Sequence, residues 1–137
     1  MQRRQHLSQT MKIRQIIKGW TVDGEMFEKI YDVACADGGK ADPKTGRWGG
    51  NGATVDMDTL KPDETKGDSM LSAMWSDPDF DAKVPAFYYV RVLEIPTPRW
   101  STRDAAKLGV EIPAGLPATI QERAWSSPIW YTPPATP

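Results

Sequence analysis

Two runs of β-prone residues near the start of the chain predict two strands joined by a tight turn. Residues 12–20 and 26–34 are rich in β-branched and aromatic side chains, and Asp23-Gly24 lies between them. A type I′ turn needs positive φ at both central residues, and Asp-Gly adopts this conformation readily. We therefore expect an antiparallel hairpin that turns at Asp23-Gly24.

The most apolar run, residues 86–95, predicts a strand at the centre of the sheet. A short helix is expected near 101–108, because Ser101 and Asp104 have the spacing of a capping box and Gly109 follows as a stop signal. Shorter alternating patterns predict further strands at 54–57, 70–75, 119–125 and 129–131.

These signals together indicate the fold class. The last two patterns are either a strand pair or one strand interrupted at 126–128, and 61–67 is expected to be a loop. Eleven Gly and 12 Pro are too many for a helical bundle. We expect a mainly β protein, an antiparallel β-sandwich-like module of five to seven short strands with one short helix. Its single β-rich domain would span 12–132, between disordered tails at 1–11 and 133–137.

Charge balance and rare residues exclude several classes of protein. The chain has 17 Lys and Arg against 18 Asp and Glu, without the basic excess typical of nucleic-acid-binding proteins. One histidine, His6, and one cysteine, Cys35, are too few for the common zinc sites or an internal disulfide. No apolar run has the length of a membrane span, and no secretory signal is recognisable. We therefore expect no cofactor and no nucleic-acid or membrane partner, and the compartment stays open.

Three alternate carboxylates, those of Asp77, Asp79 and Asp81, resemble the start of a calcium-binding loop. The match then fails, because Ala82 stands where the sharp turn needs Gly and Tyr88 stands where a bidentate Glu is needed. A solvated acidic turn is the alternative. We predict no metal site, and these three aspartates are the candidates if one exists.

A second carboxylate pair, Asp56 and Asp58, would share one face of a strand. Paired carboxylates can act as acid and base in hydrolysis, so an acid–base hydrolase that uses Asp56, Asp58 or Glu122 is one alternative function. A solvent-facing row of carboxylates is the other interpretation. We expect the chain by itself to be non-catalytic.

Six tryptophans are the most unusual feature of the composition. Trp75, Trp125 and Trp130 lie within apolar alternation and are expected in the core, whereas Trp48 and Trp100 lie in loops and are expected at the surface. Exposed aromatic side chains on a β-module can bind sugar rings or other small ligands. A free-standing carbohydrate-binding or small-ligand-binding module is therefore another alternative.

Polar residues near the loop tryptophans would complete such a ligand-binding edge. Arg99 precedes Trp100, and Glu122 and Arg123 are adjacent. Structural ion pairing accounts for Glu122 and Arg123 equally well. The candidate residues for binding a substrate or partner are Arg99, Trp100, Glu122, Arg123 and Trp48.

Long stretches of the chain resemble a known family. FYYVRVLEIPTPRWSTRDAAKLGV (87–110) and PATIQERAWSSPIWYTP (117–133) closely resemble the C-terminal end of the bacterial domain-of-unknown-function family 3604. The shorter runs IIKGW (16–20), EKIYDVA (28–34) and SAMWSDPDFD (72–81) match in the same order. The resemblance covers about 12–133.

The resemblance implies a role within a larger protein. Members of that family are several times longer and often exported, and their N-terminal part resembles metal-dependent hydrolases of the polymerase-and-histidinol-phosphatase type. This chain would be a truncated homologue, a non-catalytic β-rich module equivalent to the C-terminal part of such a hydrolase. It would pack on a catalytic domain, or self-associate through the apolar surface that this domain covers. Four of the candidates, Arg99, Trp100, Glu122 and Arg123, lie in the matching runs.

Overall fold

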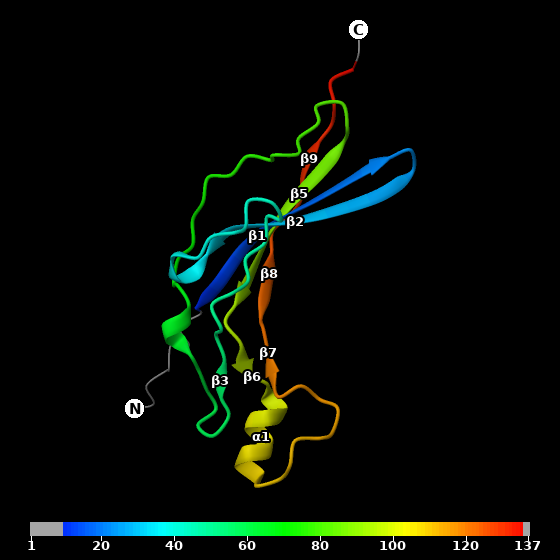
Figure 1. The fold of residues 1–137 in the computed structure, drawn as a ribbon. Coiled ribbons are helices and arrows are strands. Elements are labelled where there is room, and N and C mark those ends of the chain that lie inside the picture. The colour runs from blue at the N-terminus through cyan, green and yellow to red at the C-terminus, as the bar shows by residue number, and fades with distance from the viewer. Residues whose placement is uncertain (1–9, 136–137) are drawn as a thin grey trace, which may run out of the picture.

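A computed structural model describes residues 10–135 and shows a mainly β, antiparallel fold with one α-helix, as predicted (Figure 1). Strands β1 (Met11–Val22) and β2 (Glu25–Cys35) form the expected hairpin. Asp23 and Gly24 have φ values of 51° and 84°, which confirms the predicted turn. The proposed tail at 1–11 lies largely outside the described residues, and β1 already begins at Met11.

The main sheet has five strands, with β5 (Ala86–Glu94) in its interior. β5 pairs with β1 along one edge and, along the other, with β8 (Arg123–Trp125) and β9 (Ile129–Tyr131). Because β8 and β9 pair with opposite ends of β5, they are one edge strand interrupted at 126–128. At the interruption, Ser126 donates its backbone N–H to the carbonyl of Val90, and Val90 donates to the Ser126 hydroxyl.

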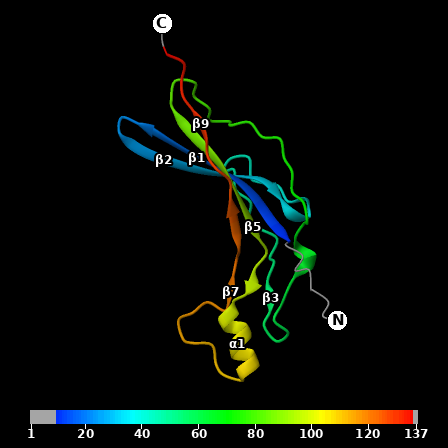
Figure 2. The ribbon, with the colours of Figure 1, turned by 180° about the vertical axis from the view of Figure 1, so that it is seen from behind.

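The residues that connect β5 to β8 form a small lobe, which we call the α1 lobe. It lies at the opposite end of the elongated molecule from β9 (Figures 1 and 2). It contains β6 (Thr97–Pro98), α1 (Trp100–Leu108) and β7 (Thr119–Ile120). The predicted capping box is wrong, because the helix starts earlier and its N-cap is Arg99, whose side chain forms no cap bond. Gly109 ends the helix at φ 66°, as expected. No helix among residues 10–135 is long and apolar enough to cross a membrane.

The segment between β2 and β5 departs most from the predicted elements. It holds two 3₁₀ turns, η1 (Ala36–Gly38) and η2 (Glu64–Lys66), and a ladder of β3 (Val55–Asp56) with β4 (Lys61–Pro62). Residues 61–62 therefore do not form the predicted loop. Pro62 has no N–H to donate, but the ladder is still closed because the backbone N–H of Asp63 donates to the carbonyl of Thr54. The pattern at 70–75 forms no strand. Counting every strand of two or three residues, residues 10–135 form nine strands, more than the five to seven expected.

The two faces of the main sheet differ in what covers them. Residues directly opposite each other on antiparallel strands share a face. Lys18, Tyr31 and Tyr88 lie on the face that is crossed by residues 75–84, which we call the covered face. On the opposite face the ring of Phe87 lies over Gly19, where a Cβ would be 2.2 Å from the ring. Only glycine allows the ring to pack there.

Replacing Gly19 with alanine should therefore lower the free energy of unfolding by about 1–2 kcal/mol, because the new Cβ forces the Phe87 ring off the strand. Gly49→Ala is the matched control, since a Cβ at Gly49 would meet nothing within 4 Å; we expect its stability to be unchanged or raised by up to about 1 kcal/mol. Urea unfolding followed by circular dichroism measures both variants. Equal unfolding midpoints would contradict the predicted contact.

Candidate functional site

A buried ion pair fixes the segment that crosses the covered face. Nζ of Lys18, on β1, lies 2.6 Å from a carboxylate oxygen of Asp77, and each side chain is 6% exposed. The same Nζ donates to the carbonyl of Asp79 at 2.7 Å, and the hydroxyl of Tyr88 donates to Asp77 at 2.7 Å. The charge buried with Asp77 is thus balanced by one lysine and further satisfied by one tyrosine.

A second set of contacts extends this attachment to β2. The Asp79 carboxylate accepts hydrogen bonds from Lys29 and from the hydroxyl of Tyr31. The ring of Trp75 packs against Tyr31, with ring centroids 4.9 Å apart, and lies edge-on to Tyr88 at 6.5 Å. The ring of Trp75, the first residue of the crossing segment, therefore packs on Tyr31 of β2 and Tyr88 of β5, and its side chain is partly buried where a core position is predicted.

The pKa values of the groups in this cluster follow from these contacts. Burial by itself would raise the pKa of Asp77, but hydrogen bonds from Lys18 and Tyr88 bring that pKa below its ordinary value. The hydrogen bond from Lys29, then that from Tyr31, lowers the pKa of Asp79. Burial, followed by the neighbouring carboxylates, raises the pKa of both tyrosines. The cluster therefore holds its aspartates ionised and its tyrosines protonated.

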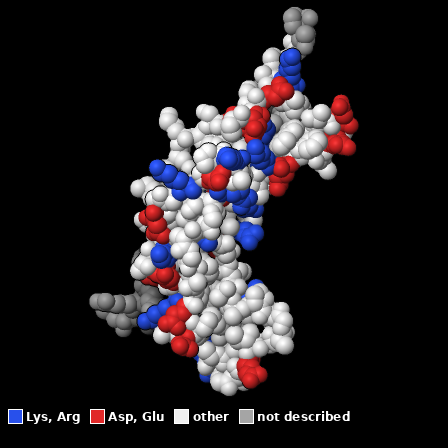
Figure 3. All heavy atoms as spheres, in the orientation of Figure 1, with Lys and Arg blue, Asp and Glu red and all other residues white. Residues whose placement is uncertain are grey.

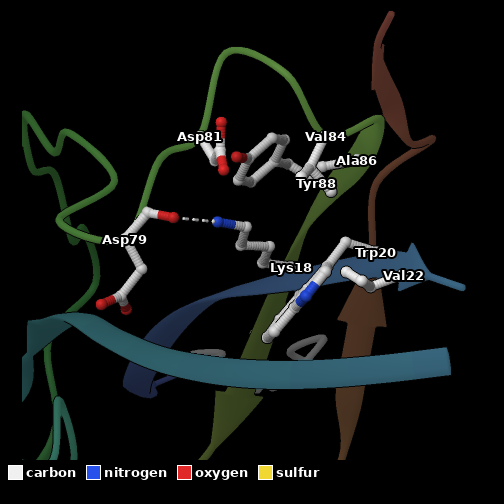
Figure 4. Close-up of a pocket in the computed structure, with 8 residues that line it drawn as sticks. All are labelled: Lys18, Trp20, Val22, Asp79, Asp81, Val84, Ala86 and Tyr88. Carbon is white, nitrogen blue, oxygen red and sulfur yellow. Dashed lines mark hydrogen bonds between the residues drawn. The ribbon is translucent and has the colours of Figure 1, made fainter. Parts of the chain in front are cut away.

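A shallow pocket of about 190 Å³ opens beside this cluster (Figure 4). Its wall combines aromatic, aliphatic and charged side chains: Lys18, Trp20, Val22, Asp79, Asp81, Val84, Ala86 and Tyr88. A second hollow of about 150 Å³ lies against Gly19, Phe87 and Trp130. Both are smaller than the roughly 300–1,000 Å³ of ordinary small-molecule sites. Neither hollow is therefore large enough for an ordinary small-molecule ligand.

The three aspartates considered for calcium are each engaged by protein groups. Asp77 and Asp79 bind the lysines and tyrosines described above, and Asp81 accepts a hydrogen bond from the backbone N–H of Lys83. Among residues 10–135, no three His, Cys, Asp or Glu side chains are grouped so as to hold a metal ion. The acidic turn thus fastens its own segment to the sheet.

The other carboxylate pair also lies in a turn. Asp56 accepts hydrogen bonds from the hydroxyl of Thr59 and the backbone N–H of Asp58, and these bonds lower its pKa. Asp58 lies outside β3, so the expectation that the two side chains share one face of a strand is wrong. Their geometry is that of an aspartate that closes a turn.

Aromatic and arginine side chains gather on the uncovered face of β5, β8 and β9. Trp130 lies opposite Phe87, Trp125 opposite Arg91 and Arg123 opposite Leu93, and alternate residues of β5 share this face. The ring centroids of Phe87 are 5.2 Å from Trp130 and 6.4 Å from Tyr89. We call this surface the aromatic–arginine face; it consists of Phe87, Tyr89, Arg91, Arg123, Trp125 and Trp130.

Two of the predicted core tryptophans belong to this face and are exposed. Trp125 is 58% and Trp130 is 72% exposed, so their assignment to the core is wrong. Alternation correctly placed each on an apolar face, but no segment of residues 10–135 covers these two side chains. The sequence did not predict Phe87, Tyr89 and Arg91 as surface residues of a site, because the pattern of a central strand does not show which of its faces is exposed.

A polar chain holds Arg91 on this face. Arg91 Nε donates to Gln15 at 2.8 Å, and Gln15 donates to Asp32 at 2.6 Å. The other oxygen of Asp32 accepts from Arg47 Nε and from the backbone N–H of Trp48. Gln15 and Asp32 are both buried, so this row of bonds across β5, β1 and β2 limits the positions available to Arg91.

The predicted binding residues do not form one site. Trp48 is half-buried against Gly39, near β2. Arg99 occupies the N-cap position of α1, and Trp100 is 78% exposed at the start of that helix. The α1 lobe is largely uncharged on the side seen in Figure 3 and exposes Trp100, Leu108, Val110 and Leu116.

Glu122 and Arg123 separate at the sheet. Arg123 joins the aromatic–arginine face, whereas Glu122 lies near Glu94, which is on the covered face. Neither forms an ion pair within the described part of the chain, so their predicted structural pairing is not seen there. Of the five predicted binding residues, only Arg123 lies on the aromatic–arginine face.

Replacing Asp77 with asparagine should lower the free energy of unfolding by about 3–5 kcal/mol near pH 7, because Lys18 stays buried without its counter-charge. The folded-state pKa of Asp77 is lowered, so the stabilisation is complete above the ordinary aspartate pKa of about 3.9 and is lost as pH falls through the lower folded value. Wild-type protein should thus lose more stability than Asp77→Asn on acidification below about pH 4.

Urea midpoints at neutral and acid pH measure this difference. Asp81→Asn is the control, because this exposed carboxylate of the same segment accepts one local hydrogen bond. It should change stability by less than about 1 kcal/mol. An Asp77→Asn variant as stable as Asp81→Asn would show that the ion pair does not hold the segment.

The comparisons with known proteins identify the family. A profile described as "Protein of unknown function (DUF3604)" matches residues 4–133, nearly the whole chain. No curated protein and no solved structure matches the chain. The matched span includes every strand of the main sheet and the α1 lobe. The chain therefore belongs to the DUF3604 family.

Proposed function

We propose that this chain is a non-catalytic docking module that binds a folded protein region through the aromatic–arginine face. The observation that carries the proposal is the extent of its surface. The chain exposes 10318 Å², whereas a folded domain of 15.3 kDa should expose about 7,100 Å². The excess is roughly 3,200 Å².

This excess is as large as a protein interface. Residues 1–9 and 136–137 lie outside the described range, and the largest surface that they could contribute is about 1,800 Å². Subtracting all of it still leaves an excess of at least about 1,400 Å². One partner in a standard stable complex contributes about 800 Å². A folded partner could therefore cover an interface of ordinary size on this chain.

The arrangement of the aromatic–arginine face supports docking onto protein. Phe87 contacts both Tyr89 and Trp130, so the rings pack against each other as side chains do within one layer of a core. A sheet buries its apolar face against a second layer, and segment 75–84 supplies such a layer only on the covered face. On the opposite face Ile17 and Gln15 of β1 are buried, whereas Trp125 and Trp130 are exposed, so a partner would supply the missing layer over β8 and β9.

The family resemblance suggests the partner. The resemblance implies that longer members of the family carry an additional N-terminal region similar to metal-dependent hydrolases. We propose that the aromatic–arginine face packs on that region, so that this chain acts as its accessory module. Self-association through the same face is the competing outcome, because a second copy could also cover it.

The test mixes this chain with the N-terminal region of a long family member, produced without the segment equivalent to this chain. We expect a one-to-one complex by light scattering, and loss of the fluorescence of a hydrophobic dye bound to the free chain. Trp130→Ser should weaken the complex by about 2 kcal/mol or more, as for an interface hot spot.

Trp100→Ser is the matched control, because Trp100 is as exposed as Trp130 but lies at the other end of the molecule. It should leave the complex unchanged. Equal weakening by both variants, or a free chain that stays monomeric and binds neither the dye nor the N-terminal region, would refute the docking function. A homodimer sensitive to Trp130→Ser would identify a second copy as the occupant.

A further inference from the structure

We infer that the surface docked on the aromatic–arginine face is an apolar patch bordered by carboxylates. This inference rests on the proposed docking function and specifies the chemistry of the partner. It follows from the arrangement of two arginines around one exposed tryptophan.

Trp125 is a direct neighbour of both Arg91 and Arg123 on the same face of the sheet. Arg91 is directly opposite Trp125 across the β5–β8 ladder, and Arg123 is two residues before Trp125 on β8. Trp, Tyr and Arg are the residue types most enriched among interface hot spots. This face holds two tryptophans, two arginines and Tyr89. The combination fits a protein partner with an apolar centre.

Neither arginine is neutralised by the described part of the chain. Arg91 is held by the amide oxygen of Gln15, which carries no charge. The guanidinium group of Arg123 forms no hydrogen bond or ion pair with residues 10–135. Both cations therefore keep the capacity to bind carboxylates.

The acidic side chains nearest in sequence lie on the other side of the sheet. Glu94 is on the covered face, and burial followed by the charge of Glu122 raises its pKa, so these two glutamates are neighbours. At this end of the sheet Glu94 and Glu122 thus lie on one face and Arg91 and Arg123 on the other, while Arg14, opposite Val92, lies on the face of Glu94. The carboxylates that complete the aromatic–arginine face have to come from the partner.

Docking would remove water from both arginines, and this makes carboxylates on the partner necessary. An arginine that loses its water without gaining a carboxylate is strongly unfavourable, whereas a planar carboxylate can accept two parallel hydrogen bonds from a guanidinium group. A partner that covers Trp125 also covers the two arginines beside it. A purely apolar partner surface would leave both charges uncompensated, so carboxylates at the border of its apolar patch are the matching chemistry.

The experiment measures binding of the same N-terminal region to Arg123→Glu, with Lys44→Glu as the control. Lys44 is exposed in the loop after β2, and its replacement makes the same change in net charge. We expect Arg123→Glu to weaken binding by about tenfold or more, mainly through slower association at low salt, and Lys44→Glu to have little effect. Raised ionic strength should weaken wild-type binding more than Arg123→Glu binding.

Each outcome has a distinct meaning. A wild-type complex that is insensitive to salt and to Arg123→Glu would overturn the acidic-partner inference while the docking function stands. Absence of any wild-type complex would overturn the docking function, and the inference with it. Arg123-dependent binding to polygalacturonate instead of the N-terminal region would assign the face to an acidic glycan. Urea midpoints equal to wild type confirm that Arg123→Glu and Lys44→Glu are folded.

Discussion

The buried ion pair between Lys18 and Asp77 determines which face of the sheet is covered. Lys18 would be costly to bury alone, so the segment that carries Asp77 has to cross the face on which Lys18 lies. Tyr31 and Tyr88 direct their hydroxyl groups to the same segment. The segment thereby becomes the second layer for one side of the sheet, and the aromatic side chains of β5, β8 and β9 are left without a layer on the other.

Features that depend on local chemistry could be predicted from the sequence. The hairpin was found because Asp23-Gly24 favours positive φ wherever it occurs, and Gly109 marked the end of α1 for the same reason. The interior position of β5 followed from its apolar run. The predictions of a loop at 61–62 and a strand at 70–75 were wrong. Whether such a short segment pairs depends on its neighbours in the folded chain, which no local pattern reveals.

The candidate site could be predicted only in part, because alternation shows which residues share a face but not whether that face is covered. Trp125 and Trp130 were for this reason assigned to the core, although they are exposed. Arg123 was recognised beside Glu122, and the extended backbone then sends the two side chains to opposite faces. Arg91 was missed, since its position depends on Gln15, which is distant in sequence.

The strand order also determines when the aromatic–arginine face can exist. The β1–β2 hairpin closes locally, whereas β5 has to find β1 across the long segment that separates them, a slow kind of pairing. Within the described residues β8 and β9 join the main sheet through β5, so they can pair only once β5 is available. During synthesis the face is therefore incomplete until residue 131 has emerged from the ribosome. A region that precedes this segment in the same polypeptide would have to fold, and remain soluble, before its docking surface is available.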